Sequence, residues 1–188
     1  MADLQASGVP IDGEAGVGYR IGSHVDLPPL MFSHAEIEAL AIGARFVESW
    51  GGPGLAHAAR SALAKIAAAL PRDKRATLES SRLFAPGFFI DPAVGERVDE
   101  LRAALAQRRM LELGYRDGDG RTTSRRLRPL GLYFWGGAWS LGAWCELRQD
   151  FRNFRLDRID TLRVLDETSP DEAGKRLEDF VRAMESRE

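Results

Sequence analysis

The sequence predicts an α+β protein in which a helical region is followed by a small antiparallel β-barrel. Apolar residues recur at helical spacing between about residues 33 and 108, and from residue 110 onward they alternate with polar residues instead. Glycine-rich turns separate the alternating segments, which is the pattern of short antiparallel strands. We divide the chain into an N-terminal region 1–27, a helical linker region 28–108, a β-barrel 109–166 and a C-terminal helix within 167–188.

The N-terminal region is expected to contain a β-hairpin. Two short apolar segments, residues 9–11 and 17–21, flank a turn over residues 12–16. The glycines of this turn do not form a phosphate-binding loop, because no Lys-Ser or Lys-Thr pair follows them. We therefore assign them a turn role.

Three helices are predicted in the linker region. Ser33 and Glu36 have the spacing of a capping box, which starts a helix that ends near Trp50. A second helix covers about residues 54–70 and a third about 94–108. The segment between these two is irregular, with a candidate strand over 81–84 and an apolar patch at 88–90.

Five strands are predicted for the barrel, and a helix over about 170–184 follows them. The second strand is long and breaks near Pro129, and Gly136-Gly137 joins it to the third as a two-residue hairpin turn. A set of strands this short suggests a closed or partly closed barrel. The predicted strands are 110–116, 122–135, 138–147, 151–155 and 158–164.

The composition is that of an ordinary globular protein of 188 residues, with 44% hydrophobic residues and a net charge of −2. The single cysteine, Cys145, is in phase with apolar strand residues that include Leu147, so we expect a core thiol in a reducing compartment. No signal peptide and no bilayer-spanning segment is visible, which predicts a soluble, cytoplasmic protein with no membrane partner. Neither a nucleophile motif nor metal-ligand spacing is present, so we expect no enzyme and no cofactor.

Arginine is the informative residue type. All but three of the 26 basic residues are arginines, and codon usage in a GC-rich genome accounts for that overall ratio. Their placement says more: the segment from Arg109 to Asp166 holds eleven arginines, eight acidic residues and no lysine, a local charge of +3. Arginines among aromatic residues suit phosphate contact and base stacking. A solvated surface laced with salt bridges explains the same composition equally well.

Strand alternation places Ser140, Trp144 and Arg148 on one face, opposite Trp139, with Arg152 just beyond the following turn. These residues are therefore candidates for a shared anion site.

Several motifs of the barrel region resemble the WYL domain of bacterial transcription regulators. The matching segments are Ala-Trp-Ser-Leu at 138–141, Cys-Glu-Leu-Arg at 145–148, Phe-Arg-Asn-Phe-Arg-Leu-Asp-Arg-Ile at 151–159, and the upstream residues 126–132. One departure is plain, because the family's Trp-Tyr-Leu is Trp139-Ser140-Leu141 here. Ser140 cannot stack against a ligand as a tyrosine would.

The resemblance extends over nearly the whole chain. Residues 3–19 are similar to the end of the recognition helix and the wing of a winged helix-turn-helix in the YafY-like group, and residues 27–30 onward to its linker. By this resemblance, residues 1–27 are a winged-helix remnant that lacks most of the helix-turn-helix, and 28–108 serve as linker or dimerisation region.

The resemblance also implies a function. The WYL domain would be an Sm/SH3-like barrel that senses an anionic effector, single-stranded nucleic acid or a nucleotide among the candidates, and controls binding of operator DNA by a homodimer. Arg148, Arg152 and Arg155 would bind the anion, and Asp157 would orient an arginine. Arg128, Arg158, Ser140 and Trp144 complete the candidate site. The alternative is a stand-alone Sm-like module that binds single-stranded nucleic acid or another ligand without regulating a promoter.

Overall fold

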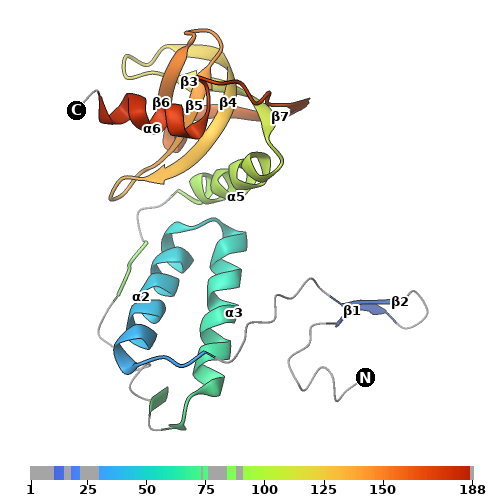
Figure 1. The fold of residues 1–188 in the computed structure, drawn as a ribbon, viewed down its shortest axis with the longest axis vertical. Helices are drawn as coiled ribbons and strands as arrows, with labels where there is room; N and C mark the ends of the chain where they lie inside the picture. The colour runs from blue at the N-terminus through green and yellow to red at the C-terminus, as the bar shows by residue number, and fades with distance from the viewer. Residues whose placement is uncertain are drawn as a thin grey trace. The chain divides into compact units, whose positions relative to one another are not determined.

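The computed structural model describes residues 11–14, 18–21, 30–72, 74–75, 84–87 and 91–186 (Figure 1). It divides into two units, residues 1–36 and 37–188, each of which is described by itself. Residues 81–83 of the candidate strand and the apolar patch at 88–90 lie outside the described residues. The division of the chain into four regions stays a prediction.

The first unit contains the expected β-hairpin. Strands β1 (Ile11–Glu14) and β2 (Gly18–Ile21) pair antiparallel, with Ile11 opposite Ile21. The hairpin prediction is confirmed, with β1 extending into the residues that were expected to turn.

Helices α2 (His34–Trp50) and α3 (Pro53–Ala69) follow the predicted boundaries closely. The capping box is present, because the backbone N–H of Ser33 donates to Glu36 Oε2 at 2.7 Å and the Glu36 N–H donates to Ser33 Oγ at 3.3 Å. The N–H of Ser33 also holds the pKa of Glu36 below its usual value. An ion pair of 3.2 Å between Glu48 and Arg60 links the two helices.

Helix α5 (Pro92–Ala106) joins this helical hairpin to the sheet. On one side, the turn between α2 and α3 lies against it: a Cβ on Gly52 would stand 2.4 Å from the carbonyl oxygen of Gly95, so only a glycine fits. The Asp99 carboxylate accepts the backbone N–H of Gly54 at 2.6 Å and so caps the start of α3. On the other side, Val98 and Leu101 are fully buried in the core of the sheet.

The five predicted strands are confirmed and form one antiparallel sheet in the order β6-β5-β4-β3-β7. The long β4 has its register shift between Pro129 and Gly131, as the sequence indicated. A short 3-10 helix, η1 (Leu156–Arg158), separates the last two strands. The strands are β3 (Arg109–Arg116), β4 (Thr122–Phe134), β5 (Trp139–Cys145), β6 (Asp150–Arg155) and β7 (Ile159–Thr168).

The sheet curls without closing. Strands β6 and β7 are its two edges and are not paired with each other, so the closed form of the predicted barrel is wrong. Residues of both edge strands nevertheless share one core, since Phe154 of β6 and Ile159 of β7 pack in the same buried cluster. The ring of Tyr115 on β3 also meets Phe154 edge-on, with ring centroids 5.0 Å apart.

Helix α6 (Leu177–Glu185) begins later than expected and lies across the sheet in Figure 1. Its Phe180 is 2% exposed and packs against Tyr133 and Phe151. Gly142 makes room for this ring, because a Cβ there would lie 2.7 Å from Phe180 Cζ. The expectation that Leu147 continues the apolar face of β5 is wrong: the strand ends at Cys145 and Leu147 is exposed in the following turn.

Candidate functional site: an arginine pocket on the sheet

Most arginines of the sheet region are neutralised by a carboxylate. Seven of the eleven between residues 109 and 166 form ion pairs, many of them across strands. Most of these seven arginines therefore belong to a surface with salt bridges, the alternative explanation that the sequence allowed. The seven are Arg109, Arg116, Arg126, Arg128, Arg152, Arg155 and Arg163.

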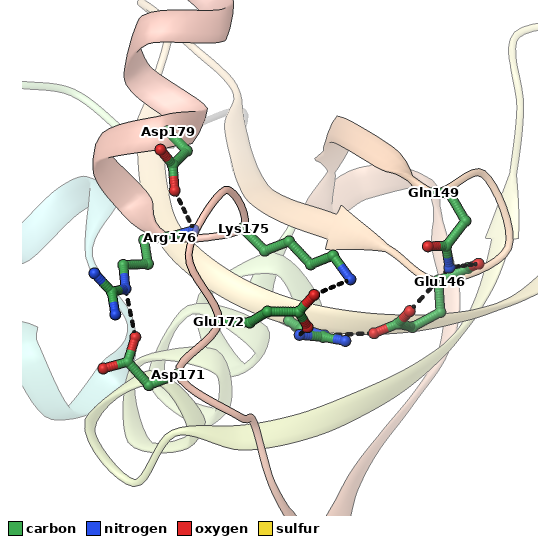
Figure 2. A network of polar contacts seen from close by, with 8 residues as sticks. Glu146, Gln149, Asp171, Glu172, Lys175, Arg176 and Asp179 are labelled. Atoms are coloured by element: carbon green, nitrogen blue, oxygen red, sulfur yellow. Dashed lines mark hydrogen bonds and ion pairs between the residues drawn. The ribbon is translucent and has the colours of Figure 1, made fainter.

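Arg128 is the most buried arginine among the predicted site residues. It donates to Glu146 and, at 2.7 Å, to Glu172 in the segment that precedes α6. Burial lowers the pKa of Arg128, but the bonds to these two carboxylates outweigh it and the pKa is raised. Glu172 also reaches Lys175 at 2.7 Å (Figure 2). Arg128 therefore fastens the C-terminal segment to the sheet.

Ser140 and Trp144 lie on the same face of the sheet as Arg128. Ser140 is 3% exposed and its hydroxyl already accepts the indole N–H of Trp135 at 2.9 Å. Trp144 stands edge-on to Phe151, and the ammonium group of Lys175 lies 5.0 Å from the centre of its ring. The C-terminal segment thus contacts this face. Arg148 lies in the turn after β5 and lines a pocket with Cys145 on the opposite face, so the expectation that it shares a face with Ser140 and Trp144 is wrong.

Arg148 and Arg152 do come together, and Arg125 joins them. The three line one pocket of about 210 Å³. The remaining lining residues are Tyr115, Asp117, Cys145, Asn153 and Phe154.

Strand register explains why the pocket forms. Arg125 stands opposite Leu113 and in phase with Leu127, both fully buried, so its side chain starts on the core face of β4. Arg152 stands opposite Ala143, which is also fully buried. Each strand from β3 to β6 therefore contributes at least one residue of this face to the pocket.

The pocket carries positive charge that the protein does not fully neutralise. The Nη1 nitrogen of Arg125 is buried and has no hydrogen-bond partner among the described residues. Arg148 is exposed and forms no ion pair within the described ranges, whereas Arg152 pairs with Asp150 at 2.6 Å. Asp117 also lines the pocket, but one oxygen of its carboxylate accepts the backbone N–H groups of Asp119 and Arg121.

Sequence reasoning missed Arg125. The signal was present, because strand alternation places this arginine in phase with Leu127, on a face that should be apolar. An arginine at such a position indicates a polar cavity or an anion. Arg158, by contrast, lies in η1 and does not line the pocket.

Arg155 belongs to a second cavity, of about 270 Å³, which Trp50, Trp139 and Asp157 also line. Its guanidinium group holds both oxygens of Asp157, at 3.0 and 2.7 Å, as the orienting role of Asp157 predicted. These bonds raise the pKa of Arg155 and lower that of Asp157. The indole N–H of Trp139 donates to the carbonyl oxygen of Trp50 at 2.6 Å. The polar groups named here already have partners inside the protein.

In the described part of the chain, no three metal-ligating side chains lie together, and no helix combines the length and the apolar character that crossing a bilayer requires.

Comparison with known proteins identifies relatives. The WYL domain family model matches residues 96–164, from α5 into β7. The uncharacterised HTH-type transcriptional regulator YobV of Bacillus subtilis (strain 168) is 28% identical over 174 residues, which cover 88% of this chain and 54% of that protein. Protein PafC of Mycobacterium leprae (strain TN) is 32% identical over 155 residues, which cover 80% and 47%. The chain spans about half the length of these two curated relatives.

Among solved structures, proteasome accessory factor B/C (PafBC) of Arthrobacter aurescens is 26% identical. The match covers 80% of this chain and 24% of that one, with a TM-score of 0.40.

Proposed function

Since residues 96–164 match the WYL domain family and one curated relative is an HTH-type transcriptional regulator, we propose that this chain is the effector-sensing part of such a regulator and binds an anionic ligand in the pocket of Arg125, Arg148 and Arg152. One observation carries this proposal: Arg125, whose Nη1 nitrogen is buried and has no partner among the described residues, lines a cavity together with two further arginines. Leaving such a donor unsatisfied costs about 1–3 kcal/mol, and an anion in the pocket would remove that cost.

Phosphate is the anion that this pocket suits best. Guanidinium groups bind phosphate oxygens in pairs, and three of them can surround one phosphate group. The half-buried ring of Tyr115 and the buried ring of Phe154 line the same pocket, and Tyr115 offers a surface on which a base can stack. We therefore favour a nucleotide or a single-stranded nucleic acid as the effector class.

The finer expectations about the fold are part of this proposal. The strand order, the curl of the sheet and the 3-10 turn between its edges support a partly closed Sm/SH3-like barrel. The β1–β2 hairpin supports the wing assignment. An effector that binds one arrangement of the domains more tightly would change operator binding by a cytoplasmic homodimer.

A stand-alone binding module remains a second candidate, because the pocket is built entirely from residues 115–154. The two functions differ in whether ligand changes the affinity of the DNA-binding protein for its operator. Only a regulator requires that change.

Isothermal titration calorimetry with pyrophosphate and an eight-residue oligothymidylate, in a buffer without phosphate or sulfate, tests the site. We expect the wild-type chain to bind and the variant Arg125→Gln/Arg148→Gln to lose most of its affinity. The matched control is Arg126→Gln/Arg163→Gln, which removes two charges from exposed arginines paired with Glu167 and Glu112. Equal losses in both double variants would show a general charge effect and would refute the site.

A further inference from the structure

One hydrogen bond joins a residue of the arginine pocket to a residue of the second cavity. The ring of Tyr115 lines the arginine pocket, and its hydroxyl oxygen accepts the backbone N–H of Arg155 at 3.3 Å. Arg155 in turn lines the second cavity. Tyr115 therefore lines the ligand pocket, and its hydroxyl group is bonded to a residue of the second cavity.

The second cavity lies where the sheet holds the end of α2. Trp50 is the last residue of that helix, and the bond from Trp139 satisfies its carbonyl group, which has no partner within the helix. The ring of Phe134 packs against both, with centroids 5.0 Å from Trp50 and 5.3 Å from Trp139. We call Trp50, Phe134 and Trp139 the aromatic joint.

A short path connects Tyr115 to this joint. Arg155 pairs with Ser140 across the β5–β6 ladder, and Ser140 directly follows Trp139. A shift of the Arg155 backbone therefore displaces Ser140, which is the neighbour of Trp139 in the joint. Pairing with Asp157 also holds the Arg155 side chain in place.

We propose that Tyr115 is a positioning residue that couples occupancy of the arginine pocket to the packing of the aromatic joint at the end of α2. This coupling rests on the proposed anion site. The Tyr115 hydroxyl accepts from Arg155, and its own proton has no acceptor within the described part of the chain. An anion in the pocket supplies that acceptor, and a hydroxyl that donates to an anion becomes a stronger acceptor itself.

The direction of the coupling follows from this chemistry. Ligand binding strengthens the Tyr115–Arg155 hydrogen bond and reduces the motion of β6 relative to β5. The aromatic joint then packs more firmly against the end of α2. Because coupling between two sites is reciprocal, loosening the joint weakens ligand binding by the same factor. Spatial connection alone does not establish coupling, so both directions need measurement.

Hydrogen exchange of the full 188-residue chain measures the first direction. Saturating pyrophosphate is expected to slow exchange of backbone amides in residues 46–52 of the wild type. In Tyr115→Phe, which keeps the ring and loses the hydroxyl, pyrophosphate still binds but the slowing at 46–52 disappears. Tyr133→Phe is the matched control, because Tyr133 is also half-buried but packs against Phe180 outside the pocket; it should behave as wild type.

The second direction is measured by affinity. Trp139→Phe removes the indole donor of the joint and is expected to weaken pyrophosphate binding by about 5-fold or more. Arg163→Gln, which breaks an exposed ion pair with Glu112, should leave the affinity unchanged.

The outcomes separate the coupling from the site. Binding with slowed exchange in both wild type and Tyr115→Phe would overturn the role of Tyr115, and binding without slowed exchange in the wild type would overturn the coupling while the site stands. If neither pyrophosphate nor oligothymidylate binds the wild type, the proposed site and the coupling both fail.

Discussion

Replacing Arg125 by methionine is expected to stabilise the ligand-free chain and to abolish anion binding. The reason lies in the buried Nη1 nitrogen, which has no partner among the described residues, and in the proximity of two like charges, Arg148 and Arg152. Methionine keeps an unbranched, adaptable apolar stem beside Leu113 and removes the stranded donor. A functional residue of this kind lowers stability in return for binding.

The magnitude follows from the cost of the unsatisfied donor. A buried donor without a partner costs about 1–3 kcal/mol. Arg125 as a whole is only half-buried, so the lower end of this range applies and we expect a gain of about 1 kcal/mol. In a chain of this size, such a gain raises Tm by about 2–4 °C.

Urea unfolding followed by circular dichroism, in a buffer free of phosphate and sulfate, provides the assay. The control is Arg126→Met at the neighbouring position, where the arginine is 51% exposed and paired with Glu167; its free energy of unfolding should change by less than about 0.5 kcal/mol. Added pyrophosphate should stabilise the wild type but not Arg125→Met. A loss of stability in Arg125→Met would mean that the guanidinium group supports the fold, and the reasoning would be refuted.

Three further outcomes are expected. Lys175 and Arg128 hold the pKa of the Glu172 carboxylate below the usual 4.5. The stability that this carboxylate contributes is therefore complete above pH 4.5 and is lost as the pH falls through the lowered pKa. Trp144 fluorescence should report release of the C-terminal segment on acidification, and Glu172→Gln should remove this pH dependence. Gly142→Ala should destabilise the chain by about 1–3 kcal/mol in urea unfolding, because the added methyl group collides with a packed ring, and a smaller side chain on α6 should restore part of the loss. In titrations at several salt concentrations, oligothymidylate affinity should fall with a log–log slope no steeper than about −2, since three arginines neutralise at most three phosphates of a single strand.

Local patterns predicted the elements well because each depends on neighbouring residues. The capping box of Ser33 and Glu36 places the start of α2, and the alternation beginning at Met110 defines β3. The bulge near Pro129 follows from the missing N–H of proline. No long-range information enters these inferences.

The site could be predicted only in part, because arginine partners depend on contacts distant in sequence. Arg128 meets Glu172, 44 residues away, and Arg126 meets Glu167, so neither pair is visible from local spacing. Arg148 and Arg152 were selected correctly as neighbours. The late start of α6 has a similar origin, because residues 170–176 are held by long-range pairs such as that of Glu172 instead of by helical hydrogen bonds.

The close approach of Gly52 to Gly95 has a consequence for protein engineering. Since Gly52 carries no side chain, the turn after α2 packs directly against the backbone of Gly95 in the first turn of α5, and Asp99 adds a hydrogen bond from the N–H of Gly54. A chimera that combines the β3–β7 sheet of one relative with the helices of another would have to take α5 and the turn between α2 and α3 from the same protein. Any side chain in place of Gly52 would put its Cβ 2.4 Å from the carbonyl oxygen of Gly95.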